Sequence, residues 1–153
     1  MAPALEDNLM KKVIPLLVFV LLVAACVVSE PFTNSHVEGN VPEQPQFTQY
    51  LERDVKAYLK CEDVSVELLR KKPTQVGLAY PKYYAWVVGK KSGKVATQGA
   101  MRIAAIDKEM FEVTHYFTAR ELRENEELAR NTFPKPLVAE VLRRAKQAGD
   151  SSL

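Results

Sequence analysis

The fold is decided by residues 77–117, which read GLAYPKYYAWVVGKKSGKVATQGAMRIAAIDKEMFEVTHYF. Apolar and polar positions alternate through most of this stretch, as they do in strands that turn one face toward a core. Two short polar interruptions, Gly89–Lys94 and Asp107–Glu109, divide it, and each suits a turn between neighbouring strands. The sequence therefore predicts an antiparallel meander of hairpins.

A helix and a further strand precede the meander. Phe47, Leu51 and Val55 follow the 3.6-residue period, which predicts an amphipathic helix over residues 46 to about 60. Val64–Leu68 then alternates as a half-buried strand does. The domain is therefore expected to open with a helix followed by the first of about four strands.

Helices follow the meander. Thr118 and Glu121 have the spacing of a capping box, which starts a short and highly charged helix. Pro134 and Pro136 precede a last amphipathic helix that Gly149 can end. This order predicts an α+β domain over residues 46–149, with the C-terminal helices packed on one face of the sheet and residues 150–153 as a tail. In element order alone it resembles the cystatin-like and NTF2-like architectures.

The segment Tyr80–Trp86 carries three of the six tyrosines and the single tryptophan. Alternation places Tyr84 and Trp86 on one face of the sheet, and Tyr83 and Ala85 on the other. An exposed pair of these rings would make a good anchor for a partner, so Tyr83, Tyr84 and Trp86 are candidate partner or ligand contacts. The alternative, which aromatic enrichment in sheets favours, is that the rings pack under the helices.

The N-terminal segment has the layout of a secretory signal peptide. Lys11 and Lys12 precede an uncharged stretch, residues 13–28, in which small residues stand directly before Cys26. The stretch is shorter than the roughly 20 apolar residues that a membrane span needs. Its segment Leu22-Val23-Ala24-Ala25-Cys26 resembles the lipobox of bacterial lipoproteins.

The lipoprotein resemblance implies that Val23, Ala24 and Ala25 are recognised by the signal peptidase and that Cys26 is lipidated. Two or three acyl chains on one residue anchor a protein firmly in a membrane. Val27 is not aspartate, which in a diderm implies the outer membrane, although inner versus outer membrane stays open. The alternative is an uncleaved single-pass signal anchor. Both interpretations place the bulk of the chain outside the cytoplasm.

The resemblance divides the chain before the domain into two parts. Residues 1–25 are the expected signal peptide, and Met10 looks like its natural start because the acidic pair Glu6–Asp7 is unlike the start of a signal. Residues 26–45 combine the lipidated cysteine with prolines, asparagines and a glycine, which predicts a flexible tether.

No recognisable catalytic or cofactor motif follows. His115 is the only histidine of the domain. Strand alternation places it on one face with Phe111, Val113 and Phe117 and turns Glu112 and Thr114 to the other, so we expect His115 to lie at the edge of the core. The domain has no phosphate-binding glycine loop, no metal-ligand spacing and no serine elbow. With Cys26 lipidated, Cys61 has no disulfide partner and is expected to be a small buried side chain. These observations predict that the chain is not an enzyme and needs no cofactor or metal.

Charge bears on the kind of partner. The 153 residues carry a net charge of +2, which argues against a nucleic-acid binder. Basic residues gather at Arg70–Lys72 with Lys82 and again over Lys90–Lys94. Solvated lysines that keep the protein soluble explain both clusters, and the sharper alternative is contact with anionic lipid headgroups or cell-wall polymer.

The sequence thus predicts a non-catalytic, membrane-anchored lipoprotein of the bacterial cell envelope that binds a protein partner through the aromatic strand or a sheet edge. Two alternatives stay open. One is a small-molecule or glycan-binding module that uses the concavity between sheet and helices. The other is a small NTF2-like enzyme that works through His115 and a carboxylate.

Overall fold

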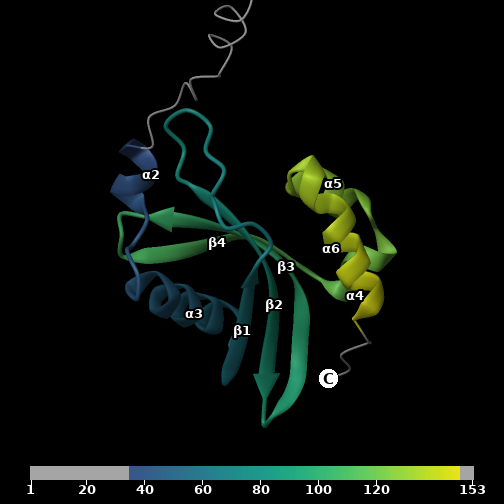
Figure 1. The fold of residues 1–153 in the computed structure, drawn as a ribbon. Coiled ribbons are helices and arrows are strands. Elements are labelled where there is room, and N and C mark those ends of the chain that lie inside the picture. Colours follow the sequence, from purple (N-terminus) through teal and green to yellow (C-terminus); the bar gives the residue numbers. More distant parts are fainter. Residues whose placement is uncertain (1–34, 149–153) are drawn as a thin grey trace, which may run out of the picture. The chain divides into compact units, whose positions relative to one another are not determined.

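The computed structural model describes residues 35–148 (Figure 1). The α+β class is confirmed, with one main helix before a four-stranded sheet and helices after it. The elements are α2 (Ser35–Asn40), α3 (Gln46–Leu59), β1 (Asp63–Leu68), β2 (Lys82–Lys91), β3 (Lys94–Ile106), β4 (Met110–Thr118), α4 (Ala119–Glu124), α5 (Glu127–Thr132) and α6 (Lys135–Gln147). Among these residues no helix has the length and apolar character needed to cross a membrane.

The strands form one sheet in the order β1-β2-β3-β4, and each is antiparallel to the next. Ser92 and Gly93 make the two-residue turn between β2 and β3, and both have the positive φ angles that such tight hairpins need. The predicted meander is confirmed except at its start. Residues 69–81 form a long connection from β1, hereafter the β1–β2 loop, before β2 begins at Lys82.

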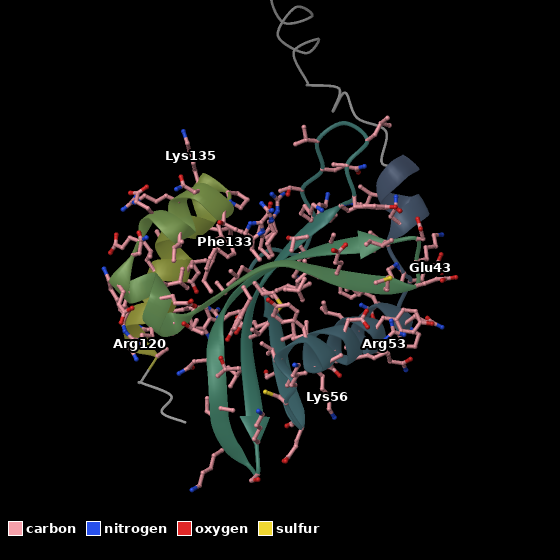
Figure 2. The ribbon with its side chains drawn as sticks, turned by 180° about the vertical axis from the view of Figure 1, so that it is seen from behind. Glu43, Arg53, Lys56, Arg120, Phe133 and Lys135 are labelled. Atoms are coloured by element: carbon pink, nitrogen blue, oxygen red, sulfur yellow. The ribbon has the colours of Figure 1, made fainter. Side chains whose placement is uncertain are left out.

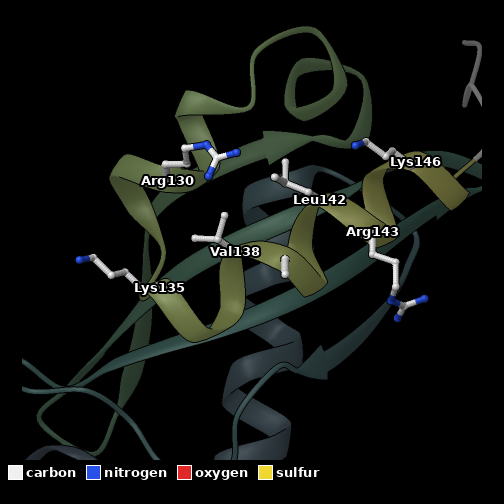
Figure 3. Close-up of a pocket in the computed structure, with 7 residues that line it drawn as sticks. Arg130, Lys135, Val138, Leu142, Arg143 and Lys146 are labelled. Carbon is white, nitrogen blue, oxygen red and sulfur yellow. The ribbon is translucent and has the colours of Figure 1, made fainter.

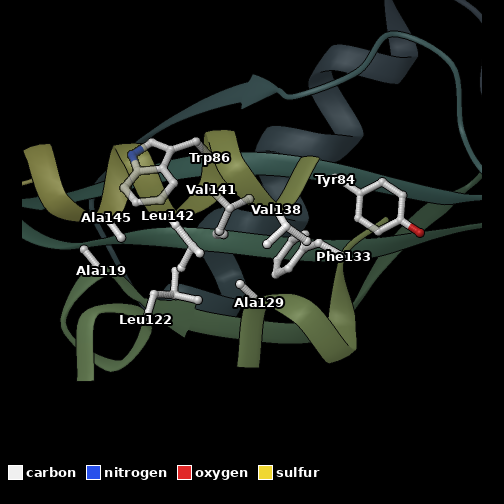
Figure 4. Packing of buried hydrophobic residues seen from close by; sticks show 11 residues of the cluster. Tyr84, Trp86, Ala119, Leu122, Ala129, Phe133, Val138, Val141, Leu142 and Ala145 are labelled. Carbon is white, nitrogen blue, oxygen red and sulfur yellow. The ribbon is translucent and has the colours of Figure 1, made fainter. Parts of the chain in front are cut away.

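Helices cover both faces of the sheet, as Figures 1 and 2 show from opposite sides. Helix α3 covers one face, where the ring of Phe47 meets the rings of Tyr83 and Phe111 edge to face at centroid distances of 5.1 Å. Helices α4, α5 and α6 cover the other face (Figure 4). The side chains buried there are Tyr84, Trp86, Ala100, Ala119, Leu122, Ala129, Phe133, Val138, Val141, Leu142 and Ala145.

Strand alternation works for β2 and fails within β4. The register of β3 and β4 shifts once, so that Thr114 is an extra residue in β4. Phe111 and Val113 pack with the α3 cluster, whereas Phe117 packs against the C-terminal helices. The prediction that these residues share one face with His115 is therefore wrong, because one inserted residue exchanges the faces beyond it.

Residues 35–45 also differ from the predicted tether. They include α2, and the carbonyl of Asn40 accepts a hydrogen bond from the Lys108 N–H at 3.0 Å. The Asn40 side-chain oxygen accepts a second bond from the Asp107 N–H at 3.3 Å, and Pro42 is buried. The folded part of the chain therefore begins before Gln46, and only residues 26–34 of the predicted tether lie outside the described residues.

The predicted helix starts are confirmed. The Thr118 hydroxyl accepts the Glu121 N–H at 3.2 Å, and the Glu121 carboxylate accepts the Thr118 N–H at 2.8 Å, which completes the capping box. The last amphipathic helix is α6, which begins directly after Pro134. Gly149, expected to end it, lies outside the described residues.

Candidate functional site

The aromatic rings of β2 belong to the core. The exposed fractions of Tyr83, Tyr84 and Trp86 are 4%, 6% and 7%. Tyr84 shares a hydrogen bond of 2.7 Å with the hydroxyl of Thr74, and burial raises the pKa of Tyr83 to about 12. The rings therefore pack under the helices, as the alternative prediction has it, and none of the three is an exposed anchor for a partner.

His115 lies on the exposed surface of β4. Its side chain is exposed rather than at the core edge, and its ring lies 6.1 Å from the ring of Phe117. Partial burial and the nearby positive charge of Arg102 lower the pKa of His115. Within residues 35–148 His115 forms no hydrogen bond to an acid, and no three potential metal ligands of that part of the chain gather at one place.

Cys61 is buried, as expected of a small apolar side chain. Its thiol donates a weak hydrogen bond to the carbonyl of Leu59 at 3.5 Å, directly after α3. It lies against Gly89 of β2, where a Cβ atom would come within 2.6 Å of the Cys61 sulfur. Glycine at position 89 therefore leaves room for the thiol in the core.

Buried side chains fill the space between the sheet and the helices on both faces. A pocket of about 520 Å³ lies instead on the outer surface of α5 and α6 (Figure 3). We call it the α5–α6 groove. Its lining residues are Arg130, Lys135, Val138, Ala139, Leu142, Arg143 and Lys146.

The groove arises from the spacing of residues along α6. Val138 and Leu142 are four residues apart, so they lie one turn apart on the same side of the helix and form the apolar floor together with exposed Ala139. Arg130 and Lys146 lie along one side of this floor, while Lys135 and Arg143 extend outward from it (Figure 3). The result is an apolar strip with cations on its rim.

Carboxylates of α6 and of Glu126, directly before α5, neutralise most of these cations. Glu126 pairs with Arg130 at 3.1 Å and with Lys146 at 3.2 Å. Arg143 pairs with Glu140 at 2.6 Å. Within the described part of the chain, Lys135 is the lining cation that forms no ion pair. The groove therefore suits an apolar segment with few carboxylates better than it suits a polyanion.

The ion pairs beside the groove also lower the pKa values of their acidic partners. Hydrogen bonds from Arg143 and Arg144 lower the pKa of Glu140 to about 2. Arg144 reaches Glu67 of β1 as well, at 2.6 Å, and so ties α6 to the edge strand of the sheet. The α6 side of the groove is thus fixed to the sheet by ionic contacts as well as by its apolar side chains.

Comparisons with protein-family models, with curated proteins and with solved structures find no match to this chain. The predicted lipidation and recognition residues, Val23, Ala24, Ala25 and Cys26, lie outside the described residues. Sequence reasoning identified α6 as amphipathic but missed the groove. The sequence feature that could have indicated the groove is the pair of lysines, Lys135 and Lys146, at the two ends of this helix.

Proposed function

We propose that this chain is a non-catalytic lipoprotein of the bacterial cell envelope, anchored through acyl chains on Cys26, whose α+β domain binds a protein partner. The observation that carries the anchor is the segment Leu22–Cys26, which follows two lysines and a short apolar run as a lipobox does. Val27 favours the outer membrane if the cell has one.

The described residues support binding rather than catalysis. His115 has no acidic neighbour to form a dyad, and both interfaces between sheet and helices are filled by buried side chains. General acid–base chemistry needs a proton donor or acceptor held within reach of a substrate, and small-molecule binding needs a concave pocket with convergent polar groups. These observations also weigh against the glycan-binding and NTF2-like enzyme alternatives.

The contact surface that fits this function is the α5–α6 groove. Its floor presents exposed Ala139 and the small exposed parts of Val138 and Leu142 to a partner, and Lys135 offers a positive charge that no described carboxylate neutralises. We expect the partner to present an apolar segment with a carboxylate beside it, because burying the floor excludes water and the carboxylate pairs with Lys135.

Metabolic labelling with an alkyne fatty acid in a native-type host tests the anchor. The full chain should take up the label, and Cys26→Ser should abolish it, because the serine hydroxyl is not the thioether-forming group that lipoprotein acylation uses. Equal labelling of both chains, or of neither, would refute lipidation at this residue.

A photo-crosslinking amino acid at Ala139 tests the groove in cells. The matched control position is Ala57, which is also an exposed alanine, within helix α3 on the other face of the sheet. We expect position 139, and not position 57, to crosslink to one envelope protein, at an apolar segment that carries a carboxylate. Lys135→Glu should reduce the crosslink. Crosslinks from both positions, or from neither, would rule out the groove as the contact surface.

A further inference from the structure

The β1–β2 loop exposes the most accessible large apolar side chains of the described part of the chain. Val76 and Leu78 are 84% and 86% exposed, and Tyr80 is 41% exposed. Side chains of this size that gather at one exposed place usually mark a contact with another molecule or with a membrane. We call residues 75–80 the loop tip.

The base of the loop is firmly built. Thr74 and Lys82 exchange two backbone hydrogen bonds of 2.8 Å each, and Thr74 also bonds the hydroxyl of Tyr84. Pro81 is fully buried, and its carbonyl accepts the Ala105 N–H at 3.0 Å. Hydrogen bonds therefore hold the base of the loop in place, and the loop tip projects from this base.

The tip itself is a turn. The carbonyl of Val76 accepts the Ala79 N–H at 3.2 Å, and Gly77 within this turn has a φ of +56°, which side chains other than glycine rarely adopt. The turn leaves Val76 and Leu78 with their side chains in solvent. Glycine at position 77 thus supports a tip that presents apolar groups outward.

Three consecutive cations lie beside the tip. Arg70, Lys71 and Lys72 are exposed, and among residues 35–148 no carboxylate pairs with any of them. The neighbouring turn Asp107–Glu109 has two carboxylates and one lysine, and this single net negative charge does not balance the three cations. Exposed apolar side chains next to unpaired cations are typical of segments that lie in the interface of an anionic membrane.

The loop lies at the end of the sheet where the described chain begins. Lys82, at the base of the loop, pairs with Ala104 near the end of β3, and the β3–β4 turn that follows bonds Asn40 of α2. Figure 1 shows the loop and α2 at this same end of the sheet. Cys26 precedes Ser35 by nine residues, a length of chain that spans at most about 32 Å. A lipid on Cys26 would hold this end within reach of the membrane.

We propose that the loop tip inserts Val76 and Leu78 into the interface of an anionic bilayer while Arg70, Lys71 and Lys72 contact its phosphate headgroups. The loop thereby fixes the orientation of the domain over the membrane. The inference rests on the proposed attachment for bringing this end close to lipid, and its chemistry is that of an anionic phospholipid surface.

The opposite end of the sheet supplies an internal control. The β2–β3 hairpin also carries lysines near its turn that pair with no described carboxylate, and Val95 beside them is 39% exposed. It lacks an apolar tip comparable to the pair Val76 and Leu78. Charge alone would therefore bring both ends to an anionic membrane, whereas insertion is expected only of the loop.

The test uses the full chain, extracted from membranes and reconstituted into lipid vesicles. An environment-sensitive fluorophore is attached at Leu78→Cys in one sample and at Val95→Cys in the other. The parent chain, treated in the same way, measures the background from Cys26 and from buried Cys61. Vesicles of phosphatidylcholine alone are compared with vesicles that also contain phosphatidylglycerol.

We expect a blue shift and brighter emission from position 78 in vesicles with phosphatidylglycerol, and water-like emission from position 95 in both kinds of vesicle. Lys71→Glu with Lys72→Glu should remove the shift. Raising the salt to about 1 M should weaken it, because the screening length falls to about 3 Å.

Each other outcome overturns the inference. Water-like emission from position 78 means no insertion, and equal shifts from positions 78 and 95 mean adsorption by charge alone. Equal shifts in the two lipid compositions would show that Arg70, Lys71 and Lys72 do not bind the anionic headgroups. A shift in native membranes that is absent from vesicles would assign the loop to a protein partner. Flotation of the parent chain with the vesicles reports attachment separately, so a failed anchor and a failed loop give different results.

Discussion

The α5–α6 groove and the loop tip both combine apolar with basic side chains, yet they differ in what surrounds those groups. Leu142 in the groove is 9% exposed and belongs to the core, whereas Leu78 in the loop tip stands in solvent. The groove cations Arg130 and Arg143 are paired with carboxylates three or four residues away in the sequence, while Arg70–Lys72 pair with no carboxylate among residues 35–148. A helix brings charges at these spacings together, and a loop does not. Similar composition therefore gives a groove with a packed floor and mostly paired cations in one place, and a protruding tip beside cations without a described partner in the other.

The largest effect that tests this contrast comes from matched leucine truncations. Leu142→Ala should lower the free energy of unfolding by about 2 to 5 kcal/mol, because it removes buried contacts under the groove. Leu78→Ala should change it by no more than about 0.5 kcal/mol, because an exposed side chain loses no packing. Denaturant unfolding of the full chain in detergent measures both. Similar losses would show that the loop leucine has a structural role and would break the contrast.

A smaller effect is expected at the glycine of the loop tip. Gly77→Ala should cost about 1 kcal/mol, because an alanine is strained at positive φ. Gly39→Ala is the control. Gly39 lies in α2, where a Cβ meets no atom within 4 Å, and alanine is the better helix former. Thermal unfolding should rank the Gly77 variant below the parent chain and the Gly39 variant not below it. The reverse order would mean that the turn at Gly77 is not the one described.

We expect the loss of stability in acid to come from the carboxylates beside the α5–α6 groove rather than from the loop tip. The pKa of Glu140 is lowered from 4.5 to about 2, so its ion pairs contribute stability above pH 4.5 that is lost as the pH falls toward 2. The pKa of Glu126 is also lowered, mainly by its hydrogen bond to Lys146, so the ion pairs of Glu126 contribute to the same loss of stability in acid. Unfolding measured between pH 6 and pH 2 should show this loss, and Glu140→Gln should make it less steep. An unchanged slope in the variant would remove the role assigned to these pairs.

The smallest effect on stability is expected from the loop cations. Lys71→Ala with Lys72→Ala should leave the free energy of unfolding within about 0.5 kcal/mol of the parent value, because neither side chain has an ionic partner among the described residues. Thermal unfolding of the double variant in detergent checks this directly. A clear loss of stability would reveal a partner for these lysines within the folded chain and would weaken their assignment to lipid.

Local rules predicted much of the fold. The period of Phe47, Leu51 and Val55 located α3, and the spacing of Thr118 and Glu121 located the start of α4. Alternation assigned the rings of β2 to the correct faces. These features depend on residues close together in the chain, for which helix caps and strand alternation are reliable guides.

The rest depended on contacts between distant residues. The extra residue Thr114 in β4 reverses the faces of Phe117 and His115, and nothing in the neighbouring sequence marks it. The contacts of Asn40 with the β3–β4 turn order a segment that composition alone suggested was a tether. The groove exists because α5 folds back beside α6, and a helix period read alone contains no information about the neighbouring helix.

The loop tip shows a different limit. Sequence reasoning noticed the cluster Arg70–Lys72 but extended the strand pattern back to Gly77, which would have buried every second residue of the tip. Val76 and Leu78 are instead separated by the single residue Gly77 within a turn, and both point to solvent. Alternating hydrophobicity predicts a strand only where a neighbouring strand is present to pair with it.

Lipidation of Cys26 can be read from the intact mass of the mature protein, extracted from membranes of its native host. We expect a chain that begins at Cys26 and carries added acyl mass. An unprocessed and unacylated chain would contradict this expectation, because residues 13–28 would then act as a signal anchor and Cys26 would have no special role.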